Sequence, residues 1–387
     1  MRHEIAPEWV HLQYNEASQF TEVYGFAGSQ GTVNCEGVRF APQGVPARTL
    51  AVFMHPASTL QLLPMPQALA RAGVHVLCAG SRYAKNDTPL IMEKVLLDLG
   101  AYVRQAKEKW GYDKVVLCGW SGGGSLALFY QAQAEKPSIS RTPSGEEVDF
   151  SRLIAADAVI FQAAHVSRAR MLSEWIDPSV IDEHDPDRRE LELDIYDPKC
   201  PHQPPYSPAF IERFRAAQLA RMRRRTQWVR ETLSSLKLKA TGELERGFVT
   251  YRTMADLRFM DPAVDPNQRK PRWCYLGSPQ TANTGPVGIA RFSTLRAWLS
   301  QWSLDDSNAD GLKSAASVSV PLLAIENSAD DAVPQPHVRM IHDAAASRDK
   351  TFRVIEGATH YYQAQPELLR QAVDLCVGWM RRRQLID

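Results

Sequence analysis

The sequence predicts an α/β protein in which a mostly parallel sheet carries helices on both faces and is interrupted by a large, mainly helical insertion. Three observations lead to this prediction. Short apolar runs bounded by turn residues recur along the chain. Helical patterns lie between several of these runs, and such alternation is typical of parallel strands joined by crossover helices. The alternation stops near residue 165 and resumes near residue 316.

Six apolar runs, often rich in β-branched residues, are predicted to be strands of this sheet. Their continuous apolar character is typical of strands that are covered on both faces. Before them, residues 17–27 and 31–42 are candidates for an antiparallel pair at the sheet edge. The six runs span residues 49–55, 73–80, 114–120, 156–164, 319–327 and 351–357.

Helices are predicted where apolar residues recur at intervals of three and four. Residues 88–110 carry this pattern, and so do residues 365–382, where Pro366 stands near the start. Proline is favoured in the first turn of a helix. Because both segments adjoin predicted strands, we expect their apolar sides to pack on the sheet.

Residues 165–315 are predicted to form a helical cap inserted into a core made of residues 1–164 and 316–387. A long helix pattern runs from about Ser207 to Leu238. We interpret its basic residues as a solvated face paired with the acidic stretch 182–194. The alternative is a docking surface for an anionic substrate, such as a carboxylate or an acyl-CoA. The arginines are Arg213, Arg215, Arg221, Arg223, Arg224, Arg225 and Arg230.

Net charge, cysteine content and the lengths of apolar runs indicate which kinds of binding partner to expect. The formal net charge of the 387 residues is +1, which gives no reason to expect nucleic acid or a membrane. The six cysteines are scattered without a CxxC pair, so we expect free thiols and neither a metal nor a cofactor. The chain lacks a signal-like start and a run of about 18 apolar residues. We therefore expect a cytoplasmic protein with a small-molecule substrate, and a homodimer is compatible with the sequence.

Ser121 is the candidate nucleophile. It lies in Gly119-Trp120-Ser121-Gly122-Gly123, which fits the pattern G-x-S-x-G between an apolar strand and an apolar helix. A nucleophile on such a sharp turn is exposed, and small residues on either side let the strand and the helix approach closely. The following helix directs its free N–H groups towards developing negative charge.

A serine nucleophile needs a base and an orienting acid, and both have candidates downstream. One predicted strand ends before Asp330 and Asp331, and the last predicted strand ends before His360. The order serine, aspartate, histidine, each on a loop after a strand, is that of α/β-hydrolases. It would bring the three side chains to one edge of the sheet.

On these motifs the chain resembles the α/β-hydrolase superfamily over roughly residues 45–165 and 316–387. The resemblance implies an α/β-hydrolase fold. It also implies Asp330 as the acid, since the family's acid stands three residues after the position of Asn327 and is followed by Val-Pro. Asp331 is the alternative. The insertion lies outside the resemblance.

The oxyanion hole requires two N–H donors. One should be Gly122, directly after the nucleophile. The resemblance implies that the other comes from the loop after residues 49–55, which here reads His55-Pro56-Ala57-Ser58. Proline has no N–H, so Ala57 is the first candidate and Ser58 the next. We interpret His55 as a structural hydrogen-bonding residue at the base of the loop rather than as a second base.

Several residues are candidates for a substrate pocket. Trp298 and Trp302 stand one turn apart where the cap meets the core, and apolar pockets under caps commonly set acyl or aryl preference. The other candidates adjoin the catalytic motifs. They are Trp120, His55, Ser58 and Tyr361.

The function that these residues predict is cleavage of a carboxylic ester by a serine hydrolase through an acyl-enzyme. Hydrolysis of a C–C bond in a diketone-type ring-cleavage product uses the same triad, as does cleavage of an acyl thioester. A catalytically silent ligand receptor could also be built on this fold, although it would not need all three residues. Fold alone does not choose among these functions.

Overall fold

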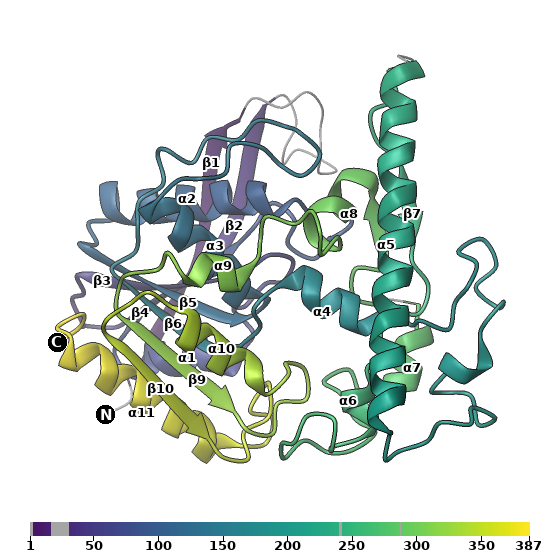
Figure 1. Cartoon of the computed structure of the whole chain (residues 1–387). Coiled ribbons are helices and arrows are strands. Elements are labelled where there is room, and N and C mark those ends of the chain that lie inside the picture. The colour runs from purple at the N-terminus through teal and green to yellow at the C-terminus, as the bar shows by residue number, and fades with distance from the viewer. Residues whose placement is uncertain (1–2, 17–30, 240–241, 287) are drawn as a thin grey trace.

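The computed structural model describes residues 3–16, 31–239, 242–286 and 288–387, and the account below concerns these residues (Figure 1). Eight of their strands form one sheet in the order β1-β2-β4-β3-β5-β6-β9-β10. The bounds are β1 Ile5–Asn15, β2 Thr32–Pro42, β3 Thr49–His55, β4 His75–Gly80, β5 Lys114–Ser121, β6 Ala158–Ala164, β9 Leu322–Asn327 and β10 Lys350–Ile355.

The sheet is mostly parallel, as the sequence predicts. Strands β4, β3, β5, β6, β9 and β10 pair in parallel with their neighbours. Strand β2 is antiparallel to both β1 and β4. This arrangement, with helices on both faces, is the α/β-hydrolase fold.

The edge strand differs from the prediction. The partner of β2 is β1, Ile5–Asn15, whereas residues 17–27, proposed from the sequence, lie outside the described residues. Only Val10 and Leu12 of β1 are buried. A strand with so much of its surface in water carries a weak apolar pattern, which explains why the sequence did not reveal it.

Helices cover both faces of the sheet and create two apolar cores (Figure 1). Leu50, Val115 and Val159 belong to the core that contains residues of α2, α3 and α10. The alternate residues Ala51 and Val116 belong to the core that contains residues of α1 and α11. The bounds are α1 Pro64–Arg71, α2 Met92–Glu108, α3 Gly122–Glu135, α10 Pro336–Ala344 and α11 Pro366–Arg382.

Residues 165–315 are mainly helical and irregular. Figure 1 shows the long helix α5 standing upright beside the sheet, with α4, α6, α7 and α8 near it. Only two short strands occur in the described part of this segment, and they pair with each other. The last helix, α9, packs on α3 of the core. The bounds are α4 Arg168–Trp175, η1 Leu191–Leu193, α5 Pro208–Lys239, β7 Gly247–Val249, α6 Leu257–Met260, α7 Pro279–Thr284, β8 Phe292–Thr294, α8 Leu295–Gln301 and α9 Gly311–Ala315.

Several basic residues of α5 are paired with acidic ones. Arg213 pairs with Glu190 and Glu192, and Arg221 pairs with Glu183. These partners belong to the acidic stretch 182–194, in agreement with the interpretation made from the sequence. Arg221 departs from that interpretation in one respect, because its side chain is fully buried rather than solvated.

Further pairs join α5 to the loop after α8. Arg223 contacts Asp305, and Arg230 contacts Asp306. These bonds hold α5 against its own segment, and none of the arginines of α5 lines the cavity described below. Within the described residues, no helix combines the length and apolarity needed to cross a membrane.

Candidate active site

Ser121 lies at a strained turn between β5 and α3. Its backbone has φ 53° and ψ −123°, a left-handed conformation that is costly for a residue with a side chain. It is the last residue of β5, and Gly122 is the first residue of α3. The strand therefore reverses into the helix without an intervening loop, as the motif predicts.

The glycines of the motif are required by the close approach of neighbouring chain. A Cβ on Gly123 would lie 2.4 Å from the carbonyl oxygen of Met54. A Cβ on Gly119 would lie 2.8 Å from the Cα of Gly124. No side chain fits in these spaces, so the strained turn depends on glycine at both positions.

His360 is paired with Asp330 behind the turn. Its Nδ1 lies 3.0 Å and 3.1 Å from the two carboxylate oxygens of Asp330. The same carboxylate accepts hydrogen bonds from the backbone N–H groups of Ala332 and Val333, both at 2.8 Å. Both His360 and Asp330 are buried. This geometry fixes the imidazole with its Nε2 available for proton transfer.

Asp331, the alternative acid, occupies a different position. Its carboxylate accepts the backbone N–H of His360 at 3.3 Å instead of contacting the ring. Burial and the neighbouring Asp330 carboxylate raise the pKa of Asp331. The backbone carbonyl of Asp331 accepts the N–H of Tyr275 at 2.9 Å, which ties residues 165–315 to the loop that carries the acid.

Trp120 connects the serine turn to the histidine. Its ring centroid lies 4.5 Å from that of His360, and its indole N–H donates to the carbonyl of His360 at 3.4 Å. The side chain of Ser121 makes no hydrogen bond to the described residues. Enzymes without bound substrate often show long or unformed catalytic hydrogen bonds, which tighten when substrate binds.

A cavity of about 340 Å³ opens beside Ser121. Trp120, His55, Ser58 and Tyr361, which the sequence suggested for a pocket, all line it, and so does Ala57. The remaining walls are mostly apolar. Those from residues 165–315 are His165, Arg168, Met171, Leu172, Trp175, Tyr275, Leu276, Gly288 and Ile289, and those from elsewhere in the chain are Lys85, Asp87, Ala332 and Val333.

Trp298 and Trp302 do not reach this cavity. Both are fully buried, and their rings stack with centroids 4.7 Å apart. Their indole N–H groups donate to Thr226 and to the carbonyl of Ala290. They form part of the apolar core between α4, α5 and α8. The sequence-based suggestion that they contact substrate is therefore corrected, because the spacing of one helical turn serves packing equally well.

The loop after β3 also corrects an expectation. The N–H of Ala57, assigned from the sequence to the oxyanion hole, donates to Nδ1 of His55 at 3.1 Å. The loop is further held by Ser81, whose hydroxyl donates to the carbonyl of Pro56, and by the N–H of Lys85, which donates to the carbonyl of Ala57. His55 thus bonds the base of the loop, as the sequence suggested.

Several residues at the site were missed by the sequence reasoning. Arg168 forms an ion pair with Asp87 at 2.6 Å in the cavity wall, and Trp175 lies on the same helix. Their place just after a strand end could have revealed them. Tyr275 and Leu276 carry no such signal, because they reach the cavity from a distant irregular stretch.

Within the described chain, no group of three or more His, Cys, Asp or Glu side chains is arranged to hold a metal ion. All six cysteines are buried free thiols.

Comparison with known proteins supports the fold. No family model and no curated protein sequence matches the chain. Among solved structures, the DcsB complex with its substrate analogue shares 15% identity and a TM-score of 0.50, over 97% of this chain and 99% of that one.

Two further structures are more distant. The monoacylglycerol lipase of Paleococcus ferrophilus has 14% identity and a TM-score of 0.46, over 89% of this chain and 98% of its own. Est1E from Butyrivibrio proteoclasticus has 13% identity and a TM-score of 0.47, over 96% and 99%. At such identities the comparison indicates a shared fold and no more. The DcsB structure, with its TM-score of 0.50, is the one that supports the shared fold.

Proposed function

We propose that the protein is a serine hydrolase that cleaves a carboxylic ester of a small molecule. The observation that carries the proposal is the position of Ser121, strained at a strand–helix turn, at the wall of a cavity and one residue from the tryptophan that packs on His360. A cavity of about 340 Å³ with largely apolar walls suits a compact acyl or aryl group.

Each residue has a defined part in the proposed reaction. Ser121 Oγ attacks the ester carbonyl and passes its proton to His360. The imidazolium then protonates the departing alcohol, which leaves an acyl group on Ser121. Asp330 holds the imidazole in the required tautomer and stabilises its positive charge without taking the proton. Water, activated by His360, releases the acid. The N–H of Gly122 is a donor to the oxyanion.

Residues 165–315 form a cap in this proposal. Nine of the residues that line the cavity come from this segment. Their contacts with the non-reacting part of the substrate would orient its carbonyl towards Ser121. Catalytic residues and selectivity would therefore come from different parts of the chain.

The test is a comparison of two serines in one cavity. The wild-type protein should hydrolyse p-nitrophenyl esters and be labelled by a fluorophosphonate. Ser121→Ala should lower kcat by roughly 10³-fold or more and abolish labelling, with unchanged far-ultraviolet circular dichroism. Ser58→Ala, in the same cavity wall, should still be labelled.

Equal labelling of the wild-type protein and Ser121→Ala would refute the nucleophile. The same enzyme should also be given an acyl-CoA and a diketone. Faster turnover of either, again dependent on Ser121, would replace the ester by a thioester or by a C–C bond. Binding without turnover of any of the three would indicate a receptor.

A further inference from the structure

His55 is held in one tautomer. Its Nδ1 faces the N–H of Ala57 at 3.1 Å and can only accept there. Burial, together with the charges of Arg168, His165 and His360, lowers the pKa of His55 well below its usual value. A neutral ring that accepts at Nδ1 carries its proton on Nε2.

The Nε2 atom of His55 is directed at the start of α3. A Cβ built on Gly122 would lie 2.5 Å from Nε2, compared with 3.1 Å from Cδ2 and 3.2 Å from Cε1 of the same ring. Since a Cβ and its own backbone nitrogen are about 2.5 Å apart by covalent geometry, Nε2 lies within about 5 Å of the nitrogen of Gly122. Nε2 has no hydrogen-bond partner in the described chain, and His55 lines the cavity together with Ser121.

The backbone donor first expected from the loop after β3 is not free. The N–H of Gly122 lies in the first turn of α3, where helical N–H groups have no partner within the helix. Pro56 has no N–H, and that of Ala57 is bound to His55. We propose that the Nε2–H group of His55 is the second donor of the oxyanion hole, an inference that rests on the proposed function.

In the proposed step, His55 stabilises the charge that forms on the carbonyl oxygen. As the bond from Ser121 Oγ to the carbonyl carbon forms, the π electron pair moves to the carbonyl oxygen and the hydroxyl proton moves to Nε2 of His360. The oxyanion accepts hydrogen bonds from Gly122 N–H and His55 Nε2–H. When the tetrahedral intermediate collapses, the electron pair on the oxyanion re-forms the C=O bond. The bond to the alcohol oxygen breaks with its electron pair staying on that oxygen, and the proton on Nε2 of His360 moves to it. His55 keeps its proton throughout, because a neutral imidazole donates without being a strong acid.

The test compares two substitutions of His55. His55→Leu removes the donor, and His55→Gln keeps an N–H donor on a flexible side chain. We expect His55→Leu to lower kcat by about 10²–10³-fold with a much smaller change in KM, and His55→Gln to recover part of the loss. His11→Gln, an exposed substitution on β1, should leave kcat unchanged.

A second readout separates a donor from a merely structural residue. Sulfur is a weak hydrogen-bond acceptor, so the wild-type enzyme should prefer an ester to the thionoester that carries C=S in place of C=O. His55→Leu should shrink this preference by roughly tenfold, and His11→Gln should leave it intact. An equal loss on both substrates would overturn the role of His55.

A third measurement needs no variant that has to fold. In nitrogen-15 spectra of the wild-type protein, His55 should be neutral with its proton on Nε2, and that proton should move downfield when a trifluoromethyl ketone forms a hemiketal with Ser121. A proton on Nδ1 would refute the inference. If Ser121→Ala keeps full esterase activity, the proposed function fails instead, so the two failures are distinguishable.

Discussion

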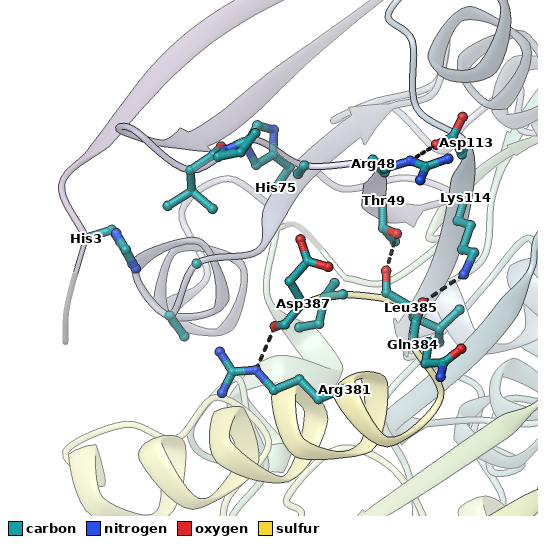
Figure 2. A pocket seen from close by; sticks show the side chains of 16 residues that line it. His3, Arg48, Thr49, His75, Asp113, Lys114, Arg381, Gln384, Leu385 and Asp387 are labelled. Atoms are coloured by element: carbon teal, nitrogen blue, oxygen red, sulfur yellow. Dashed lines mark hydrogen bonds and ion pairs between the residues drawn. The ribbon is translucent and has the colours of Figure 1, made fainter.

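Two cavities of about the same volume, 340 Å³, lie at opposite ends of the parallel strands. One adjoins Ser121, the last residue of β5. The other is lined by Thr49, His75 and Lys114, the first residues of β3, β4 and β5 (Figure 2). Volume does not distinguish them. Position does, because ligands of open α/β sheets bind beyond the carboxyl ends of the strands.

The two cavities also differ in what their polar groups do. In the cavity of Figure 2, Arg48 pairs with Asp113, the ammonium of Lys114 donates to the carbonyl of Gln384, and Arg381 donates to the carbonyl of Asp387. In the other, the Ser121 hydroxyl and the His55 Nε2–H are uncommitted within the described chain. The comparison shows that uncommitted polar groups, rather than cavity volume, distinguish the candidate active site.

The largest contrast is expected between the two adjacent aspartates. Asp330→Asn should lower kcat by about 10²–10⁴-fold, because the amide would no longer favour the tautomer in which His360 accepts the serine proton. Asp331→Asn should cost far less, since the carboxylate of Asp331 accepts the backbone N–H of His360 and makes no bond to its ring. Steady-state kinetics on one ester measure both. A larger loss for Asp331→Asn would transfer the role of the acid.

The next effect concerns selectivity. Trp175 is buried in the wall of the cavity beside Ser121, with its ring centroid 6.1 Å from that of Tyr275. Trp175→Ala should alter the ranking of ester substrates by about 1–3 kcal/mol in kcat/KM, the usual worth of lost pocket contacts. A panel of acyl chain lengths measures the ranking.

The control for this prediction is Lys114→Met in the opposite cavity. It removes a bond to the carbonyl of Gln384 and lies at the other end of β5. The ranking of substrates should stay as in the wild type. A shift equal to that of Trp175→Ala would show that the cavity beside Ser121 does not set selectivity.

The remaining expected effect is on stability in acid. Burial lowers the pKa of His55, His165 and His337 well below the usual value. Below about pH 6.5 the unfolded chain binds protons that the folded chain does not, so stability should fall as the pH falls, by up to about 1.4 kcal/mol per pH unit for each histidine. Urea unfolding at pH 7.5 and 5.5 measures the loss.

Two histidine substitutions sharpen that prediction. His337→Gln should reduce the loss between pH 7.5 and 5.5. His75→Gln should reduce it less, because burial lowers the pKa of His75 but its bond to the carbonyl of Val45 opposes this effect. An unchanged loss in His337→Gln would contradict the assignment of the acid sensitivity to the buried histidines.

Much of the fold could be predicted because it is encoded locally. The central parallel strands β3, β5 and β6 are buried on both faces and read as continuous apolar runs, and α5 begins and ends within a residue of the prediction. Strand β1 escaped because most of its residues face water. A pattern of apolar residues indicates burial, so an exposed edge strand is difficult to recognise in the sequence.

The candidate site divides in the same way. The sequence by itself predicted Ser121 at a strand–helix turn, with the glycines that this turn requires, and the order in which Asp330 and His360 follow. Local motifs sufficed for this prediction, because the ends of parallel strands at one sheet edge lie close together whatever the intervening chain. Only the tertiary structure decided which carboxylate meets Nδ1, that the N–H of Ala57 is bound to His55, and that Trp298 and Trp302 pack inside the segment 165–315. These outcomes depend on contacts between residues far apart in the chain or on the path of a loop. The spacing of residues along the sequence predicts neither.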